Sequence, residues 1–263
     1  MQVKSFEVEG TTLKVQWNPS RMVSTAAKID KASLERRPCF LCANHRPAVQ
    51  EALSMLHDYE LLVNPFPILP HHFTIPLKRH EPQRIRERFI DMMRMAEQLD
   101  DLVVFYNGPA CGASAPDHLH FQAGSRGVLP VEPPCPSFLF LASTPEAHDV
   151  WFQQLYAALP VPEGQPEPMM NILAWKDVSP QGEPQLFCRV IPRKKHRPDC
   201  YLATGDAQVL VSPGALDVAG LMITPREEDF RKMTADVAVN ILREVVLSPE
   251  EINQVESNLL FTD

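Results

Sequence analysis

The distribution of proline constrains the fold of this chain more than any other feature of its sequence. Of 263 residues, 26 are proline, and they cluster in 130–136 (PVEPPCP) and 160–168 (PVPEGQPEP). Proline has no backbone N–H to donate to a sheet or to a helix interior, so both clusters predict stiff connections. They divide the chain into a first half that ends near residue 130 and a second half that begins near residue 170.

The composition predicts a globular protein with an acidic surface. Hydrophobic residues make up 44% of the chain, charged residues make up 22%, and the net charge is -8. This charge argues against broad adhesion to nucleic acid or to an anionic membrane, both of which attract basic surfaces. The sequence has neither an apolar stretch of about 18 residues nor a signal-peptide core. Of six cysteines, only Cys39 and Cys42 are close in sequence, which favours a reducing compartment, and we expect a cytoplasmic protein.

The order of apolar segments predicts an α+β fold. The expected strands of the first half are 59–64 (YELLVN), 72–77 (HFTIPL), 102–107 (LVVFYN) and 118–123 (HLHFQA). Apolar residues at helical spacing predict a helix over 82–101. The pattern I-P-x-K-(R/K)-H-x-P occurs at 75–82 and again at 191–198, each time after strand-like residues. This echo predicts two related halves, each with an antiparallel sheet and a packed helix.

The segment 112–122 (GASAPDHLHFQ) carries the sharpest chemical signal. Alternate side chains of a strand share a face, so His118, His120 and Gln122 are expected together, with Leu119 and Phe121 in the core behind them. A neutral imidazole is a good nucleophile, and a loop with glycine and serine can offer backbone N–H groups to phosphate oxygens. The alternative is a pair of histidines on an ordinary strand.

The pattern G-x-S-x-P-x-H-x-H-x-Q in this segment resembles the active-site motif of the histidine-triad superfamily, in its H-x-H-x-Q branch of transferases and phosphorylases. That branch includes galactose-1-phosphate uridylyltransferases, diadenosine tetraphosphate phosphorylases (ATP adenylyltransferases) and GDP-L-galactose phosphorylases, and H-L-H-F-Q is most similar to the last group. The resemblance covers about residues 38–126 and implies a histidine-triad-like fold. We therefore expect a hairpin and lead over 1–37, a catalytic half over 38–130, a connection with a bridging helix over 131–169, and a degenerate half over 170–263.

The resemblance also implies a reaction. His120 would attack the α-phosphorus of a nucleotide and form a nucleotidyl-histidine, from which phosphate or a sugar phosphate takes the nucleotide. The expected substrate is a nucleoside-diphosphate sugar or a dinucleoside polyphosphate, and the wording H-L-H-F-Q favours phosphorolysis of the sugar nucleotide. A hydrolase of the triad type, a non-catalytic nucleotide-binding scaffold stabilised by zinc, and a thiol redox protein remain alternatives. Gln122 in place of a third histidine argues against hydrolysis.

The same resemblance assigns roles to further residues. The expected catalytic residues are Ser114, His118, His120 and Gln122. The expected nucleotide-binding residues are Asn64, Phe66, Asn107, Gly112 and Ala113. Two of these have other interpretations, because Asn64 could be a turn residue before proline and Phe66 could belong to the core. Candidates for binding a second phosphate are Lys78, Arg79, Lys194 and Lys195, although a run of charge is commonly a solvated face.

Cys39 and Cys42 form a C-x-x-C pair, which supplies two of the four ligands of a structural zinc site. The resemblance to the uridylyltransferases implies that His80 and His118 complete the site, with His45 as a substitute for His80. A zinc ion on His118 would brace the strand that presents His120. Inert thiols or a redox pair are the alternatives.

No organic cofactor is expected. The expected partners are the nucleotide and phosphate or sugar-phosphate substrates, without nucleic acid or a membrane. The chain would be a monomer with an internal pseudo-dimer or a homodimer.

Overall fold

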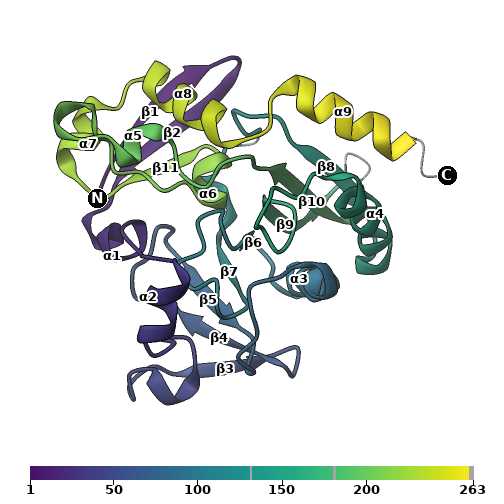
Figure 1. Ribbon diagram of the computed structural model, residues 1–263. Helices are drawn as coiled ribbons and strands as arrows, with labels where there is room; N and C mark the ends of the chain where they lie inside the picture. Colours follow the sequence, from purple (N-terminus) through teal and green to yellow (C-terminus); the bar gives the residue numbers. More distant parts are fainter. Residues whose placement is uncertain (131, 180–181, 261–263) are drawn as a thin grey trace.

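An eight-stranded antiparallel sheet forms the centre of the computed structural model, which describes residues 1–130, 132–179 and 182–260 (Figure 1). The strands follow the order β3-β4-β5-β7-β6-β9-β10-β8. Their bounds are β3 (Ala52–Met55), β4 (Tyr59–Val63), β5 (His72–Pro76), β6 (Leu102–Asn107), β7 (His120–Ser125), β8 (Phe138–Ala142), β9 (Met170–Val178) and β10 (Pro184–Pro192). Together with the helices on it, this sheet confirms the predicted α+β class.

A smaller sheet joins the N-terminal hairpin to a strand of the second half. It consists of β1 (Gln2–Val8), β2 (Thr11–Trp17) and β11 (Leu221–Thr224), in the order β1-β2-β11. The first two strands form the hairpin that the sequence predicts, with Glu9 and Gly10 in the left-handed backbone conformation of a tight turn. Strand β11 pairs with β2 in parallel, so a strand of the second half is anchored on the N-terminal hairpin.

The helices cover both faces of the large sheet (Figure 1). The α-helices are α1 (Met22–Thr25), α2 (Lys31–Arg36), α3 (Phe89–Gln98), α4 (Pro145–Ala158), α5 (Asp199–Leu202), α6 (Ala215–Val218), α7 (Glu227–Lys232), α8 (Ala235–Val245) and α9 (Pro249–Leu260). The short 3-10 helices are η1 (Pro19–Arg21), η2 (Ala43–His45), η3 (Arg86–Arg88), η4 (Arg126–Val128) and η5 (Gly205–Ala207). Among the described helices, none combines the length and the apolar character needed to cross a bilayer.

Strand β6 shows why the sheet is buried on both sides. Val104 and Tyr106 point into the core beneath α3, α4 and α9. Val103 and Phe105, which alternate with them, point into the second core, shared with β2, α6 and α8. The sheet therefore separates two apolar cores.

Two related halves meet at the β6–β9 pair. The succession β5–α3–β6–β7 recurs as β8–α4–β9–β10, and the strands of the second half lie in the reverse order. Helices α3 and α4 pack together, and the rings of Phe89 and Phe152 stack with centroids 3.8 Å apart. The structure places β8 and α4 in this repeat, although they lie within the 131–169 segment that the sequence predicts as a connection. The I-P-x-K echo ends β5 and β10, which are not counterparts in this arrangement.

Two element bounds differ from the sequence-based expectation. The strand expected from residue 118 begins at His120, because residues 116–118 form a turn that is closed by the His118 N–H on the Ala115 carbonyl. The helix expected over 82–101 is α-helical over Phe89–Gln98. Its start is delayed because the Ile85 N–H donates to the Glu167 carboxylate, outside any helical ladder.

Candidate active site

A cavity of about 630 Å³ lies against β4, β5 and β7, within the size range of small-molecule sites. Six residues that the sequence singles out line it: Asn64, Phe66, Gly112, Ser114, His120 and Gln122. Of the other predicted residues, Asn107 lines a smaller adjoining hollow of about 40 Å³, whereas Ala113 is buried. The structure therefore gathers most of the predicted nucleotide site in one place.

His120 stands at the start of β7 with its ring held in one orientation. Its Nδ1 lies 2.8 Å from the His118 carbonyl oxygen, which can only accept a hydrogen bond, so Nδ1 carries the proton. Nε2 therefore presents a lone pair in the ring that lines the cavity. Burial lowers the pKa of His120 to about 4, against the raising effect of the His118 carbonyl, so the imidazole is neutral at pH 7. The ring has the form that a nucleophile needs.

From Leu119 onward the side chains alternate as the sequence predicts, whereas His118, expected on the same face as His120 and Gln122, lies in the turn before β7 and points to Cys39 and Cys42. Leu119 and Phe121 are buried in the core beneath α3, whereas His120 and Gln122 line the cavity. The alternation of a strand therefore separates chemistry from packing at this point.

Gln83, which the sequence did not single out, fixes the backbone of His120. Its Oε1 accepts from the His120 N–H at 2.8 Å, and its Nε2 donates to the carbonyl oxygens of His120 and Asn107. The side chain is needed there because the paired residues of β6 and β7 end at Phe105 and Gln122, so Gln83 bridges the backbones of Asn107 and His120 beyond that point. Gln83 is fully buried and replaces the missing backbone pairing at the start of the strand.

His72 orients the amide of Gln122. The Ile68 N–H donates to Nδ1 of His72, so the proton is on Nε2, which donates to Oε1 of Gln122 at 2.9 Å. Burial lowers the pKa of His72 to about 4, although the Gln122 contact raises it, and the ring stays neutral. The amide nitrogen of Gln122 is left to donate into the cavity.

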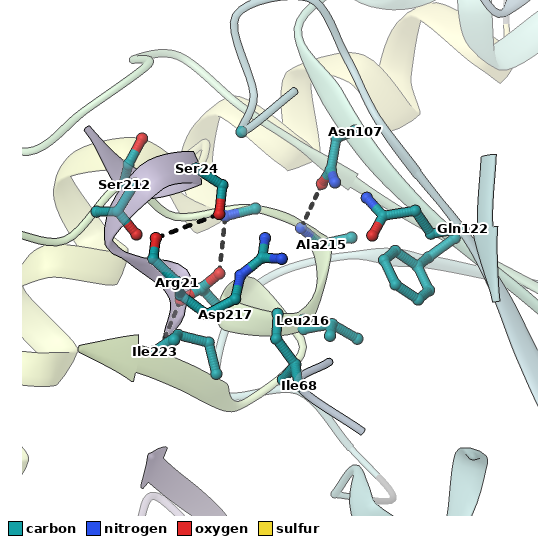
Figure 2. Close-up of a pocket in the computed structure, with 14 residues that line it drawn as sticks. Arg21, Ser24, Ile68, Asn107, Gln122, Ser212, Ala215, Leu216, Asp217 and Ile223 are labelled. Atoms are coloured by element: carbon teal, nitrogen blue, oxygen red, sulfur yellow. Dashed lines mark hydrogen bonds between the residues drawn. The ribbon is translucent and has the colours of Figure 1, made fainter. Parts of the chain in front are cut away.

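The loop that carries Gly112 is packed against a loop of the second half. Gly112 has φ +97°, and a Cβ atom there would lie 2.5 Å from the Cα of Gly214. Asn107 secures the same contact, because its Oδ1 accepts from the Ala215 N–H at 2.7 Å (Figure 2). The same oxygen accepts from the side chain of Asn171 at 2.9 Å. The Asn107 oxygen thus joins the two halves, and its position lies beside the hollow next to Gln122.

Asn64 and Phe66 lie at the rim of the cavity. The Oδ1 of Asn64 accepts from the Phe66 N–H, and its Nδ2 donates to the Thr74 hydroxyl. Asn64 is therefore a turn residue and a lining residue at the same time. Phe66 is 39% exposed and is not part of either core, so its ring is available to a ligand.

Cys39, Cys42, His80 and His118 form a cluster in which one ligand atom of each residue lies within 4.8 Å of the others. The Sγ atoms of Cys39 and Cys42 lie 3.3 and 3.5 Å from Nδ1 of His118, and Cys42 lies 3.3 Å from Nδ1 of His80. The Nε2 of His118 donates to the Leu77 carbonyl at 2.7 Å, which turns the Nδ1 lone pair toward the sulfurs. His45 instead contacts the Cys39 carbonyl.

This donor set suits a metal ion. Two thiols and two imidazole nitrogens are a common ligand set for tetrahedral zinc, and the second nitrogen of His118 has the carbonyl partner that ligating histidines use. Burial raises the pKa of the Cys39 thiol, but the His118 contact and the backbone N–H groups of Leu41 and Cys42 together outweigh it and lower that pKa to about 6. The cluster could therefore hold a metal ion through residues that the sequence predicted.

The four basic residues predicted to bind a second phosphate lie elsewhere. Among the described residues that line the cavity, none is Lys78, Arg79, Lys194 or Lys195. Lys78 donates to Ser54 and the His57 carbonyl, and Arg79 pairs with Glu81. Lys194 pairs with Glu251, and Lys195 pairs with Asp199 and Glu244. The charges of Arg79, Lys194 and Lys195 are thus paired with carboxylates, whereas Lys78 has neutral partners outside the cavity.

Other cations, which the sequence analysis missed, line the cavity instead. They are Arg21, Lys28, Arg36 and Arg37, all from the segment between β2 and β3. Arg21 also lines the smaller hollow, where it lies near Asp217, and Gln122 lines the same hollow (Figure 2). No periodic pattern marks these positions in the sequence, because short helices and turns carry them.

Comparisons with known proteins agree with this architecture. Residues 1–125 match the family described as Domain of unknown function (DUF4922), and residues 186–262 match the family described as GDPGP1-like, C-terminal domain. No curated protein sequence matches the chain.

Crystal structures of yeast Ap4A phosphorylase Apa2 superpose on 94% of this chain. The crystal structure of that enzyme gives a TM-score of 0.54 at 18% identity and is covered over 87% of its length. The complexes with AMP and with Ap4A give TM-scores of 0.56 and 0.58, each at 16% identity and 89% coverage. At these identities the comparison establishes a shared fold. The chain therefore shares its fold with this phosphorylase.

Proposed function

We propose that this chain is a nucleotide phosphorylase that carries the nucleotidyl group on His120. The observation that carries the proposal is the hydrogen bond from Nδ1 of His120 to the His118 carbonyl, which leaves Nε2 unprotonated in the ring that lines the cavity. Gln122 and the Gly112–Ser114 loop lie on the same cavity wall and supply donors for phosphate oxygens.

The reaction proceeds in two displacements. Nε2 of His120 bonds to the α-phosphorus, the bond from phosphorus to the bridging oxygen breaks, and the leaving group takes that electron pair away as a sugar phosphate or a nucleotide. An oxygen of inorganic phosphate then bonds to the same phosphorus, and the nitrogen–phosphorus electron pair returns to Nε2. A nucleoside diphosphate is released. The Nδ1 proton stays on the ring throughout, held by the His118 carbonyl.

A nucleoside-diphosphate sugar is the substrate that we propose first, and a dinucleoside polyphosphate second. The motif H-L-H-F-Q and the match to the GDPGP1-like C-terminal domain support the sugar nucleotide. The dinucleoside polyphosphate is supported by the relation to an enzyme that is named an Ap4A phosphorylase and whose structures contain AMP and Ap4A. Both substrates place a nucleoside monophosphate on His120.

We also propose that Cys39, Cys42, His80 and His118 bind one structural zinc ion. When bound, it would cross-link the Cys39–Cys42 loop to the turn that precedes β7. Phe40 and Leu41, between the two cysteines, line the cavity, so the cross-link would also fix that part of the wall. No step of the reaction passes through the metal.

Mass spectrometry of the intact protein tests the phosphorylase proposal. The protein is incubated with GDP-glucose, ADP-glucose or diadenosine tetraphosphate, first without phosphate and then with it. We expect a nucleoside monophosphate adduct that disappears on addition of phosphate, with release of nucleoside diphosphate. His120→Ala should form no adduct and lose about 10⁴-fold or more in rate. His57→Ala is the matched control, because His57 is an exposed histidine far from the cavity wall.

Two outcomes would contradict the proposal. Release of nucleoside monophosphate at a rate independent of phosphate would show that water is the acceptor. Nucleotide binding without any adduct in the wild-type protein would favour a binding scaffold.

A further inference from the structure

One wall of the cavity is cationic. Arg21, Lys28, Arg36 and Arg37 line it, whereas the described lining residues include neither aspartate nor glutamate. The chain as a whole has a net charge of -8, so the excess of positive charge belongs to this wall and not to the protein in general. All four residues come from the η1–α2 segment, which Figure 1 shows beside β4 and β5.

Three of these four cations have no carboxylate partner in hydrogen-bonding contact. Arg37 is paired with Asp117 at 2.7 Å and lies over the ring of Phe40, so its charge is used within the protein. Arg21 donates to the neutral carbonyl of Phe66. Lys28 and Arg36 make no hydrogen bond or ion pair with any other described residue. The cations elsewhere on the chain that the sequence suggested, such as Lys194, are paired with carboxylates.

The three cations differ in which hollows they line. Arg21 lines both the cavity and the smaller hollow, as Gly112 and Gln122 do, so it stands next to the proposed α-phosphate position. Lys28 and Arg36 line only the larger cavity. Burial lowers the pKa of Arg21, and Asp217 opposes this effect, so the guanidinium stays charged in a partly desolvated place. An anion that extends outward from His120 into the larger cavity would therefore have all three cations on the lining around it.

We propose that Arg21, Lys28 and Arg36 form a subsite for the phosphate oxygens beyond the α-phosphate, and that the preferred ligands therefore carry at least two linked phosphates. This inference rests on the proposed function, in which negative charge accumulates on the departing phosphate when the bond between the α-phosphorus and the bridging oxygen breaks. Preorganised cations stabilise such charge most where water is excluded. A nucleoside monophosphate alone would leave Lys28 and Arg36 without a phosphate to bind.

Binding of inorganic tripolyphosphate, measured by titration calorimetry against inorganic phosphate, tests the subsite. We expect the wild-type protein to bind tripolyphosphate more tightly than phosphate. The double variant Lys28→Gln/Arg36→Gln should bind tripolyphosphate at least about tenfold more weakly, since hydrogen bonds to charged groups contribute about 1.5–3 kcal/mol. Lys31→Gln is the matched control, because it removes one positive charge from the same helix, α2, at a residue that does not line the cavity.

The folding of each variant is checked by circular dichroism, and Arg21→Lys accompanies Arg21→Gln because Arg21 also contacts the Phe66 carbonyl. Wild-type affinity for tripolyphosphate in the folded double variant would overturn the proposal. An equal loss in Lys31→Gln would overturn it as well, because general surface charge would then account for binding.

A second arm separates the two sources of linked phosphates. Binding of ADP-glucose and of diadenosine tetraphosphate is compared in His120→Ala, with and without the two cation substitutions. A larger loss for diadenosine tetraphosphate assigns the subsite to a polyphosphate chain, and an equal loss assigns it to a single departing phosphate. Absence of loss for both ligands would overturn the proposal. None of these measurements needs turnover, so failure of the phosphorylase chemistry would leave the result on the subsite intact.

Discussion

The Nδ1 atom of His120 donates to the carbonyl oxygen of His118 at 2.8 Å, so His118 orients the His120 ring in the cavity. The ring of His118 itself contacts Cys39 and Cys42. His118 is also held by its Nε2 contact to the Leu77 carbonyl. The Cys–His cluster is thus connected to the proposed nucleophile, His120, through the backbone carbonyl of His118. A substitution in the cluster should therefore change the orientation of the His120 ring.

Removal of the cluster should lower both metal content and stability. We expect about one zinc ion per purified chain, measured by inductively coupled plasma mass spectrometry, and less in Cys42→Ser and His80→Ala. The midpoint of thermal unfolding should fall by roughly 5–10 °C, because a bound metal contributes its binding free energy to folding. Cys200→Ser is the control, since Cys200 is a free cysteine outside the cluster. Metal-free protein with an unchanged midpoint would argue for inert thiols.

His72 should act on the reaction only through Gln122. In His72→Leu, Oε1 of Gln122 loses the Nε2–H donor that orients the amide. We expect about a tenfold lower rate of adduct formation, a smaller decrease than removal of an oxyanion donor would cause. In Gln122→Ala the additional change at residue 72 should have no further effect on that rate. A double-mutant cycle on adduct formation checks this coupling. Additive losses would mean that His72 supports only the local fold.

The contact between Gly112 and Gly214 should tolerate no side chain. Gly112→Ala places a Cβ 2.5 Å from a backbone atom and also forces alanine into a left-handed conformation. We expect a loss of roughly 3 kcal/mol in the free energy of unfolding and at least about a hundredfold loss in rate, since the loop must shift. Gly10→Ala is the control, because Gly10 has a similar φ, +84°, and no atom lies within 4 Å of the new Cβ. It should lower the free energy of unfolding by about 1 kcal/mol and leave the rate of the reaction unchanged. Denaturant unfolding and kinetics of both variants separate backbone strain from the clash.

Glu167 should make the protein less stable as pH rises toward neutrality. Burial raises the pKa of Glu167 from its usual 4.5 to about 7, although hydrogen bonds from Tyr106 and Ile85 lower it. The folded state therefore binds the extra proton between these values, so the contribution of Glu167 is complete below pH 4.5 and is lost as pH rises through 7. The difference amounts to roughly 3 kcal/mol.

Glu167→Gln should remove this part of the pH dependence. We expect the free energy of unfolding of the wild type to fall relative to that of the variant between pH 5 and about 7.5, measured by urea denaturation at a series of pH values. Glu163→Gln, an exposed glutamate in the same segment, should keep the wild-type slope. Parallel pH profiles for the wild type and Glu167→Gln would show that Glu167 does not titrate in this range.

The local patterns of the sequence determined a large part of the fold and of the chemical centre. Alternation along 118–123 placed Phe121 in a core and His120 with Gln122 on a cavity, because the period of a strand is a property of the backbone. The C-x-x-C pair and the two histidines assigned by family resemblance also came together as a cluster. In the second half, the repeated I-P-x-K pattern correctly indicated two related halves but marked strands that are not counterparts.

Only the tertiary structure decided which charges face the ligand. Lys194 and Lys195 lie in the most basic run of the chain, yet they are paired with acidic side chains from α9, α8 and α5. Arg21 and Arg36 reach the cavity because the N-terminal segment crosses over β4 and β5, a path that no local pattern specifies. The sequence by itself singled out His120 as the proposed nucleophile, the strand that carries it, and the C-x-x-C pair, since these depend on neighbours a few residues away. The cationic wall, the Gln83 bridge and the Gly112–Gly214 contact depend on segments distant along the chain, whose meeting is set by the packing of the whole fold.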